Sequence, residues 1–531
     1  MKGEKDMRNI FKYGILAIAA TAVVSTSCIK ETFPTSVASN EQVAANPSAL
    51  ESMVNGMSAF VNKFDVLGSD RAYDWGYPSI GIIRDVMCED MTVIESGYDW
   101  YQAWAKNQYQ SDMYIYGQFI WNFYTQFLQT ANAVIGAVPY EGAEGAQAAY
   151  LGMAYCYRAM INLDMGRMYE YKQNNYTTAP DLVGKTIPLI LENLTEEQAR
   201  NNPRVDKAAL LEHIQGDLTK AIKLLGDYKR TAMNQPDLSV AYGLQARAYM
   251  WAEDYTNAKI AAQNALAAGS YTPLTESQWT DTKNGFNNAE SQKSWMWASM
   301  LATEDDVVQT GILNFASWMA SETTFGYASA GPFRMCDVRL YGQISDADFR
   351  KKSWKAPKGS IVETPMIANT ADYDSSVLPD LASVKFRPGS GNPDDSQTGA
   401  TVDYPLMRCE EMYFIIAECD AHAGSKASLE DFMRKYRYSS YHCSSTDLVE
   451  EVLLQKRIEF WGEGIIFYDY KRLNRSITRA YEGSQHIADS RFNTNGLAPW
   501  MCFCIVQTEH NANAACISNP DPSDTVESQN E

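Results

Sequence analysis

The fold is decided by residues 236–269, which read PDLSVAYGLQARAYMWAEDYTNAKIAAQNALAAG. Tyrosines and alanines recur in this stretch at the offsets of a tetratricopeptide repeat, namely at Tyr242, Ala246, Tyr249, Ala258, Ala262 and Ala265. The alanines let two helices approach closely, while the tyrosines fill the groove between them. Residues 253–255, Glu-Asp-Tyr, make the turn. The stretch therefore predicts a helical hairpin.

Weaker copies of this hairpin flank it on both sides. One is assembled from residues 150–168 with 207–226, and another from 405–423 with 428–438. Several copies are required, because a single hairpin cannot bury its own apolar face. Apolar residues spaced at three and four over 116–135 add a further helix. These patterns predict a scaffold of stacked helices.

Between about residues 270 and 404 the helical periodicity fades. Gly, Pro, Asn, Asp and Ser separate short apolar runs such as 295–297 and 383–386, which favours loops with a few short strands. Helical patterning returns at 406–422 and 446–463, so we interpret this segment as an insertion. The predicted fold class is mainly α: a tetratricopeptide-like helical hairpin scaffold with a loop-rich insertion layer and a few short strands.

The N-terminus has the pattern of a signal peptide over residues 1–27. Four basic residues precede an apolar run at 14–24 that is too short for a membrane helix, which needs about 20 residues. Cys28 follows small residues where this run ends, which is where bacterial lipoproteins are cleaved and acylated. We therefore expect lipid attachment at Cys28 and a polar tether over 28–45. The alternative is an ordinary secreted protein in which Cys28 follows the cleavage site by chance.

One folded domain is expected over residues 46–510, and a polar, partly disordered tail over 511–531. The net charge of −20 argues against nucleic acid as a partner and fits a neutral ligand.

Ten cysteines are present, and nine remain once Cys28 is set aside, so at least one stays unpaired. Cys156, Cys409 and Cys419 fall in apolar helical patterns and are predicted to be buried thiols. Cys502 and Cys504 are predicted to be alternate residues of a strand.

Two motifs near the C-terminus carry a family resemblance. Residues 404–421 read YPLMRCEEMYFIIAECDA, and residues 454–464 read LQKRIEFWGEG, followed by Phe-Tyr-Asp at 467–469 and Lys-Arg at 471–472. Together with the lipoprotein start and the helices at 214–222 and 236–269, these motifs resemble the SusD/RagB family of outer-membrane nutrient-binding lipoproteins. The residues from 500 to 513 match the family's usual ending only approximately.

The resemblance implies a cell-surface glycan-binding protein that is anchored in the outer membrane by lipid. Such a protein captures oligosaccharide or polysaccharide and delivers it to a TonB-dependent outer-membrane barrel, without being an enzyme and without a cofactor.

The charges of the motifs alternate in sign, as in ion pairs that lock helices and loops together. This group comprises Arg457, Glu459, Glu463, Asp469 and Arg472. We expect these residues to stabilise the fold. Arg408 and Glu411 are expected to pair in the same way, because they stand three residues apart on a helix.

Aromatic residues, 12% of the chain, point to the ligand site. The apolar face of a sugar ring packs on an aromatic ring, and polar neighbours orient its hydroxyls. In the resembled family, loops of two corresponding regions supply the glycan platform. The predicted ligand-binding residues are Trp100, Trp104, Trp318, Tyr327, Tyr101, Trp75, Tyr73 and Phe325. Asp99, Asn107 and Arg334 are candidates for orienting hydroxyls. The alternative is that these rings belong to the core.

No catalytic, metal-binding or cofactor motif has diagnostic spacing, and the five histidines lie far apart. Two other functions stay open. One is a peptide-binding uptake protein of the same fold. The other is a glycoside hydrolase, because acidic pairs such as Glu89-Asp90 and the run at 304–306 are plentiful and sequence does not reveal their spatial separation.

Overall fold

The computed structural model describes residues 47–523 and 525–529. The signal peptide, the tether and Cys28 lie outside the described residues. Within the described part, no helix is long and apolar enough to cross a bilayer.

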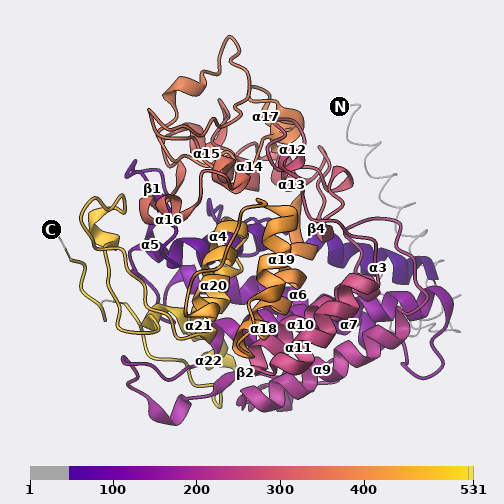
Figure 1. Ribbon diagram of the computed structural model, residues 1–531. Helices are drawn as coiled ribbons and strands as arrows, with labels where there is room; N and C mark the ends of the chain where they lie inside the picture. The colour runs from indigo at the N-terminus through magenta and orange to yellow at the C-terminus, as the bar shows by residue number, and fades with distance from the viewer. Residues whose placement is uncertain (1–46, 524, 530–531) are drawn as a thin grey trace, which may run out of the picture.

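A layer of antiparallel helices forms the lower part of the molecule (Figure 1). Each helix packs on the next along a continuous stack, in the order α6, α7, α9, α10, α11, α18 and then α19 and α20, with α3 against α6 and α7. The bounds are α3 Pro47–Phe60, α6 Ile115–Ala137, α7 Gly145–Tyr169, α9 Lys207–Leu224, α10 Leu238–Ala252, α11 Tyr255–Ala267, α18 Cys409–His422, α19 Ala427–Tyr436 and α20 Leu448–Glu459.

The hairpin predicted over 236–269 is the pair α10 and α11. The carboxylate of Asp237 accepts hydrogen bonds from the amides of Ser239 and Val240 and so starts α10. Glu253 ends it in the left-handed conformation, and Asp254 then caps α11 by accepting from the amide of Asn257. The alanines at 246, 258, 262 and 265 are fully buried, as close helix packing requires.

The two weaker hairpins are also confirmed, with one correction. Helix α7 packs on α9, and α18 packs on α19. Residues 404–408, part of which we expected to be helical, instead form strand β6 (Tyr404–Arg408), which pairs antiparallel with β4 (Trp295–Ser299). This pairing delays the start of α18 to Cys409 and joins the loop-rich layer to the scaffold.

The loop-rich layer lies above the helical layer in Figure 1. Its helices are short: α12 Glu276–Trp279, α13 Asp306–Gln309, α14 Phe315–Met319, α15 Gly326–Ser329, α16 Val338–Gln343 and α17 Ser396–Ala400. Residues 383–386, one of the short apolar runs noted in the sequence, contribute only an isolated bridge between Ser383 and Trp354. The predicted mainly α fold class with a loop-rich layer is confirmed.

The remaining elements are short. They are α4 Tyr77–Met87, α5 Gln102–Ala105, α8 Glu196–Ala199, α21 Ile466–Arg472, α22 Gln507–Ala512, β1 Met91–Val93, β2 Lys185–Pro188, β3 Arg204–Asp206 and β5 Arg334–Cys336. All residues of α4 and α21 are buried. Strand β1 pairs with β5 and β2 with β3, both antiparallel. One continuous cluster of buried apolar side chains runs from Leu50 to Cys516 and includes residues of both layers.

One expectation about the C-terminal region is wrong. Cys502 and Cys504 do not lie in a strand, because they follow a 3₁₀ turn at Pro499–Met501 and continue as buried coil. Asn519, in the described part of the predicted tail, contacts the core. The side-chain amide of Asn519 donates to the carbonyls of Tyr169 and Phe503, which ties the tail to the core. Buried hydrogen bonds of this kind replace the solvent contacts that a disordered tail would make.

All nine described cysteines are free and buried, as predicted for Cys156, Cys409 and Cys419. Burial raises the pKa of Cys156 well above its usual value. These thiols are therefore packed as small apolar side chains.

The alternating charges of the motifs form buried ion pairs, as predicted. Glu459 accepts from Arg350, Arg408 and Arg437, with the Arg437 Nη2 to Glu459 Oε1 distance at 2.7 Å. Glu463 accepts from Lys385 and Arg408.

The expected pairing of Arg408 with Glu411 is wrong. The Arg408 side chain turns towards Glu410, Glu459 and Glu463. Glu411 pairs with Arg247 of α10 at 2.6 Å, because the helix stack places Arg247 opposite it.

Candidate functional site

Strands β1 and β5 bring together two loops that are more than 200 residues apart. In this antiparallel pair Val93 stands opposite Arg334, so the loop that leaves β1 lies beside the loop that enters β5. The contact is close: a Cβ added to Gly331 would lie 3.3 Å from the Cβ of Ser96. The loop after β1, which carries Trp100, and the loop before β5, which carries Tyr327, therefore share one surface.

Trp100 and Tyr327 are the exposed rings of this surface. The side chain of Trp100 is 48% exposed, and that of Tyr327 is half-buried. Burial raises the pKa of Tyr327, and the N–H group of the neighbouring Trp100 side chain opposes that rise. The two rings are therefore neighbours, with Trp100 presenting much of its surface to solvent.

A rigid group of buried side chains supports Tyr327 from below. Its ring stacks on Trp318, with centroids 4.1 Å apart and planes at 14°, and Trp318 meets the ring of Tyr101 edge to face at 4.8 Å. The guanidinium of Arg334 lies over both Tyr101 and Trp318 and makes two hydrogen bonds, of 2.7 and 2.8 Å, to Asp99. A buried, closely packed support of this kind leaves Tyr327 little freedom to move.

Local sequence fixes the backbone at Tyr327. Gly326 has φ of +77°, and an added Cβ would come within 2.6 Å of Ser317 Oγ, so only glycine fits. The hydroxyl of Ser317 accepts from the amide of Tyr327 at 2.9 Å, and the side chain of Asn314 accepts from the amide of Ser317 to start α14. These contacts fix the backbone at Tyr327 and therefore the position of its ring.

The structure separates the eight predicted ligand-binding rings into two groups. Trp100 and Tyr327 reach the surface, and Phe325 is half-buried against the position of Gly399. The expectation of exposure is wrong for the other five, which are at most 2% exposed: Trp318, Tyr101, Trp104, Tyr73 and Trp75.

Four of these five buried rings pack against other aromatic side chains. Trp318 and Tyr101 support Tyr327, while Tyr73 and Trp104 pack edge to face at 5.0 Å inside the molecule. The polar candidates are also engaged by protein. Asp99 and Arg334 pair with each other, and the side-chain amide of Asn107 donates to the carbonyl of Pro522 at 2.7 Å.

Sequence reasoning missed the exposed rings of Tyr109 and Tyr114. The signal that could have found them is the close series of tyrosines at 109, 114 and 116, in which Tyr109 and Tyr114 precede the helix beginning at Ile115.

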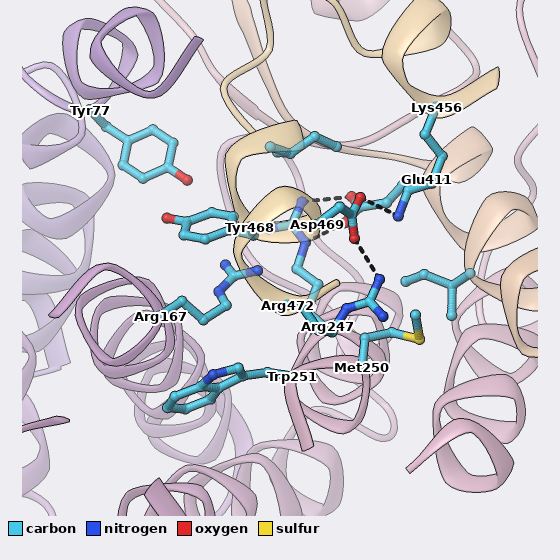
Figure 2. A pocket seen from close by; sticks show the side chains of 12 residues that line it. Tyr77, Arg167, Arg247, Met250, Trp251, Glu411, Lys456, Tyr468, Asp469 and Arg472 are labelled. Atoms are coloured by element: carbon cyan, nitrogen blue, oxygen red, sulfur yellow. Dashed lines mark hydrogen bonds and ion pairs between the residues drawn. The ribbon is translucent and has the colours of Figure 1, made fainter. Parts of the chain in front are cut away.

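A charged cavity of about 40 Å³ lies in the helical layer (Figure 2). Figure 2 shows Asp469 between Lys456 and Arg472, and Glu411 facing Arg247. Pockets that enclose small organic ligands usually measure about 300–1,000 Å³. This cavity is too small for a sugar ring, and its paired charges join helices α10, α18, α20 and α21.

The acidic pair Glu89 and Asp90 is tied to one arginine. Arg457 donates to both carboxylates, at 2.9 Å to Glu89 Oε1. Burial raises the pKa of Glu89, and the Arg457 charge opposes that rise. Within residues 47–523 and 525–529, no group of three or more potential ligands is placed to hold a metal ion.

Comparison with known proteins gives a family match over part of the chain and a shared fold over most of it. Residues 383–513 match the model of the SusD family. A SusD-like carbohydrate binding protein from Bacteroides vulgatus has the same fold, with a TM-score of 0.69 and 20% identity over 89% of this chain and 97% of its own. A SusD superfamily protein from Bacteroides thetaiotaomicron gives a TM-score of 0.68 and 18% identity over 90% and 100% of the two chains.

A third similar structure is surface glycan-binding protein A from Bacteroides fluxus, with a TM-score of 0.62 and 15% identity over 88% of this chain and 97% of its own. A search of curated proteins finds no match. The sequence match at residues 383–513 and the fold shared over most of the chain confirm the predicted resemblance to the SusD family.

Proposed function

We propose that this chain is a cell-surface protein that captures a neutral oligosaccharide or polysaccharide on the surface formed by Trp100 and Tyr327. The observation that carries the proposal is an exposed indole beside a tyrosine that is stacked on a buried tryptophan. Two of the similar structures are named as carbohydrate- or glycan-binding proteins, which supports the same ligand class here.

Preorganised rings suit sugar binding for a physical reason. The C–H groups of a pyranose face pack on an aromatic ring, and rings that are already fixed lose little conformational entropy when the ligand arrives. The net charge of −20 disfavours anionic polymers, because like charges repel. A neutral glycan is therefore the favoured ligand.

We propose binding without cleavage. Cleavage of a glycosidic bond uses two carboxyl groups that flank the bond, about 5 to 9.5 Å apart. Near the aromatic surface, the carboxylate of Asp99 is buried and held by both terminal nitrogens of Arg334. Release of reducing sugar by the purified protein would contradict this part of the proposal.

We also propose that lipid on Cys28 anchors the protein in the outer membrane, where it passes glycan to a TonB-dependent barrel. Both steps rest on the family resemblance. A binding protein beside a transporter raises the local concentration of ligand, so modest affinity is sufficient. Deleting the barrel should abolish glycan uptake, whereas unchanged uptake would contradict delivery.

The test of binding is calorimetric titration of the chain from residue 29 with soluble glucans, mannans and xylans, and with peptides. Trp100→Ala and Tyr327→Ala should each weaken binding by about tenfold or more, equivalent to about 1.4 kcal/mol. The control is Ile361→Ala, which removes an exposed apolar side chain elsewhere in the loop-rich layer and should have no effect. Glycan binding that ignores both ring variants would contradict the site, and peptide binding would favour the peptide-uptake alternative.

A further inference from the structure

The ring contacts continue from Tyr101 through the interior to a second exposed surface. The successive centroid distances are 5.9 Å from Tyr101 to Trp104, 4.9 Å from Trp104 to Tyr116, 5.9 Å from Tyr116 to Tyr109 and 5.1 Å from Tyr109 to Tyr114. Trp104 is buried, so the two exposed ends of this series are separated by core. One end is the Trp100 and Tyr327 surface, and the other is formed by Tyr109 and Tyr114.

The second end presents apolar surface to solvent. Tyr109 is 47% exposed, Tyr114 is 40% exposed and Met113 is 69% exposed. Tyr109 and Tyr116 are nearly parallel, with planes at 10°, so that Tyr109 is supported by a second ring. This resembles the support of Tyr327 by Trp318.

The chain accepts backbone strain to hold Tyr109 in this position. Its φ is +58°, in the left-handed region that costs a bulky residue about 1–2 kcal/mol. The tail secures the segment, because Asn107 donates to the carbonyl of Pro522 and the amide of Gln110 donates to the hydroxyl of Ser523. Strained residues that the surroundings hold in place cluster at functional sites.

A groove of about 540 Å³ runs beside Tyr114, and its polar lining suits sugar hydroxyls. The lining polar residues are Ser69, Gln118, Asn122 and Thr508. Thr508 donates to Gln118 at 2.9 Å, and Gln118 donates to Asn122 at 2.5 Å. Among the described residues that line the groove, none carries a charge, although the chain as a whole is 21% charged. Amides and hydroxyls beside tyrosine rings match a neutral, hydroxylated ligand.

We propose that this groove and the rings of Tyr109 and Tyr114 form a second subsite for the same neutral glycan. The inference rests on the proposed function, because it concerns where else that ligand binds. One polysaccharide chain that reaches both surfaces would be held at two points, and such linkage raises overall affinity by about 10²–10⁴-fold over one site. The protein would then bind long glycans more tightly than short fragments.

The test compares two double variants of the purified protein, Tyr109→Ala with Tyr114→Ala and Trp100→Ala with Tyr327→Ala. The probes are the polysaccharide that binds best in the panel above and a short oligosaccharide cut from it. The unchanged protein should bind two short oligosaccharides per chain and each double variant one. The affinity for the polysaccharide should fall in both variants, by at least about tenfold.

Two further measurements keep the result decisive. Gln118→Ala leaves all rings in place and should weaken oligosaccharide binding at the second subsite alone. Misfolding would instead weaken binding at both subsites, so a selective loss cannot come from misfolding. Thermal melting of each variant checks its folding.

The outcomes separate this inference from the proposed function. One bound oligosaccharide per chain, with polysaccharide binding unaffected by the Tyr109 and Tyr114 changes, would overturn the second subsite and leave the function standing. If the tyrosine variant loses only co-purification with a membrane barrel, the surface docks protein and the inference fails. If no glycan in the panel binds, the proposed function itself fails.

Discussion

The buried carboxylate of Glu459 is balanced by three arginines at once. Burial alone would raise the pKa of Glu459, but the charges of Arg437, Arg408 and Arg350 hold it well below its usual value. Removing one member of such a cluster leaves an uncompensated buried charge, which costs about 3–5 kcal/mol. The motif charges are therefore explained by stability alone.

Asp85 behaves in the opposite way and gives a prediction about pH. Its carboxyl group is buried, and burial raises its pKa from 3.8 to about 8, although it accepts a hydrogen bond from the amide of Gly464 at 3.0 Å. Between pH 4 and pH 8 the folded state keeps a proton that the unfolded state releases, so this group destabilises the fold progressively as the pH rises.

Asp85→Asn removes that titration and keeps a side chain of the same shape. The variant should gain stability relative to the unchanged protein as the pH is raised from 5 to 8, by up to about 4 kcal/mol at about 1.4 kcal/mol per pH unit. Melting temperatures of both proteins across this pH range provide the measurement. A difference that is constant with pH would show that Asp85 is ionised in the folded state.

Two elements far apart in sequence make backbone contact at a pair of glycines. Gly81 lies in α4, and Gly464 lies in the turn between α20 and α21. A Cβ added to Gly464 would lie 2.5 Å from the Cα of Gly81, and Gly464 has φ of +70°. Glycine is therefore required at position 464 for two reasons: its backbone is left-handed, and a Cβ would clash with Gly81.

Gly464→Ala should destabilise the protein more than Gly424→Ala does. Gly424 has a similar φ of +80°, but an added Cβ would meet nothing within 4 Å, so its replacement should cost only about 1–2 kcal/mol for the conformation. At Gly464 the clash adds about 1–3 kcal/mol. Urea unfolding of both variants measures the difference, and equal losses would mean that α4 moves away without cost.

At the scale of the whole molecule, the proposed location of the protein depends on Cys28, which lies outside the described residues. Cys28→Ala removes the only thiol available for acylation at the predicted cleavage site. Since several acyl chains on Cys28 are expected to hold the protein at the membrane, the variant should appear in the soluble fraction. Cell fractionation measures this, with Cys88→Ala as a control that leaves the anchor unchanged. Retention of the Cys28 variant in the membrane fraction would contradict lipid anchoring.

The sequence by itself determined the hairpins and the buried charges of the motifs. Helical periodicity and small residues at matching offsets are encoded within a few tens of residues, so α10 and α11 could be predicted with their turn. Charges of alternating sign at 457–472 likewise indicated ion pairs, although the partners were not predictable. Arg408 was expected to pair with Glu411, three residues away, but long-range packing turned it towards Glu459 and Glu463.

Only the tertiary structure decided which aromatic rings face solvent. Trp100 and Trp104 stand four residues apart in similar sequence, yet Trp100 is exposed and Trp104 is buried. The difference arises because the pairing of β1 with β5 sets Tyr327 beside Trp100, while Tyr73 and Tyr116 enclose Trp104. Burial depends on neighbours that are distant in the chain, and no local pattern of residues records them.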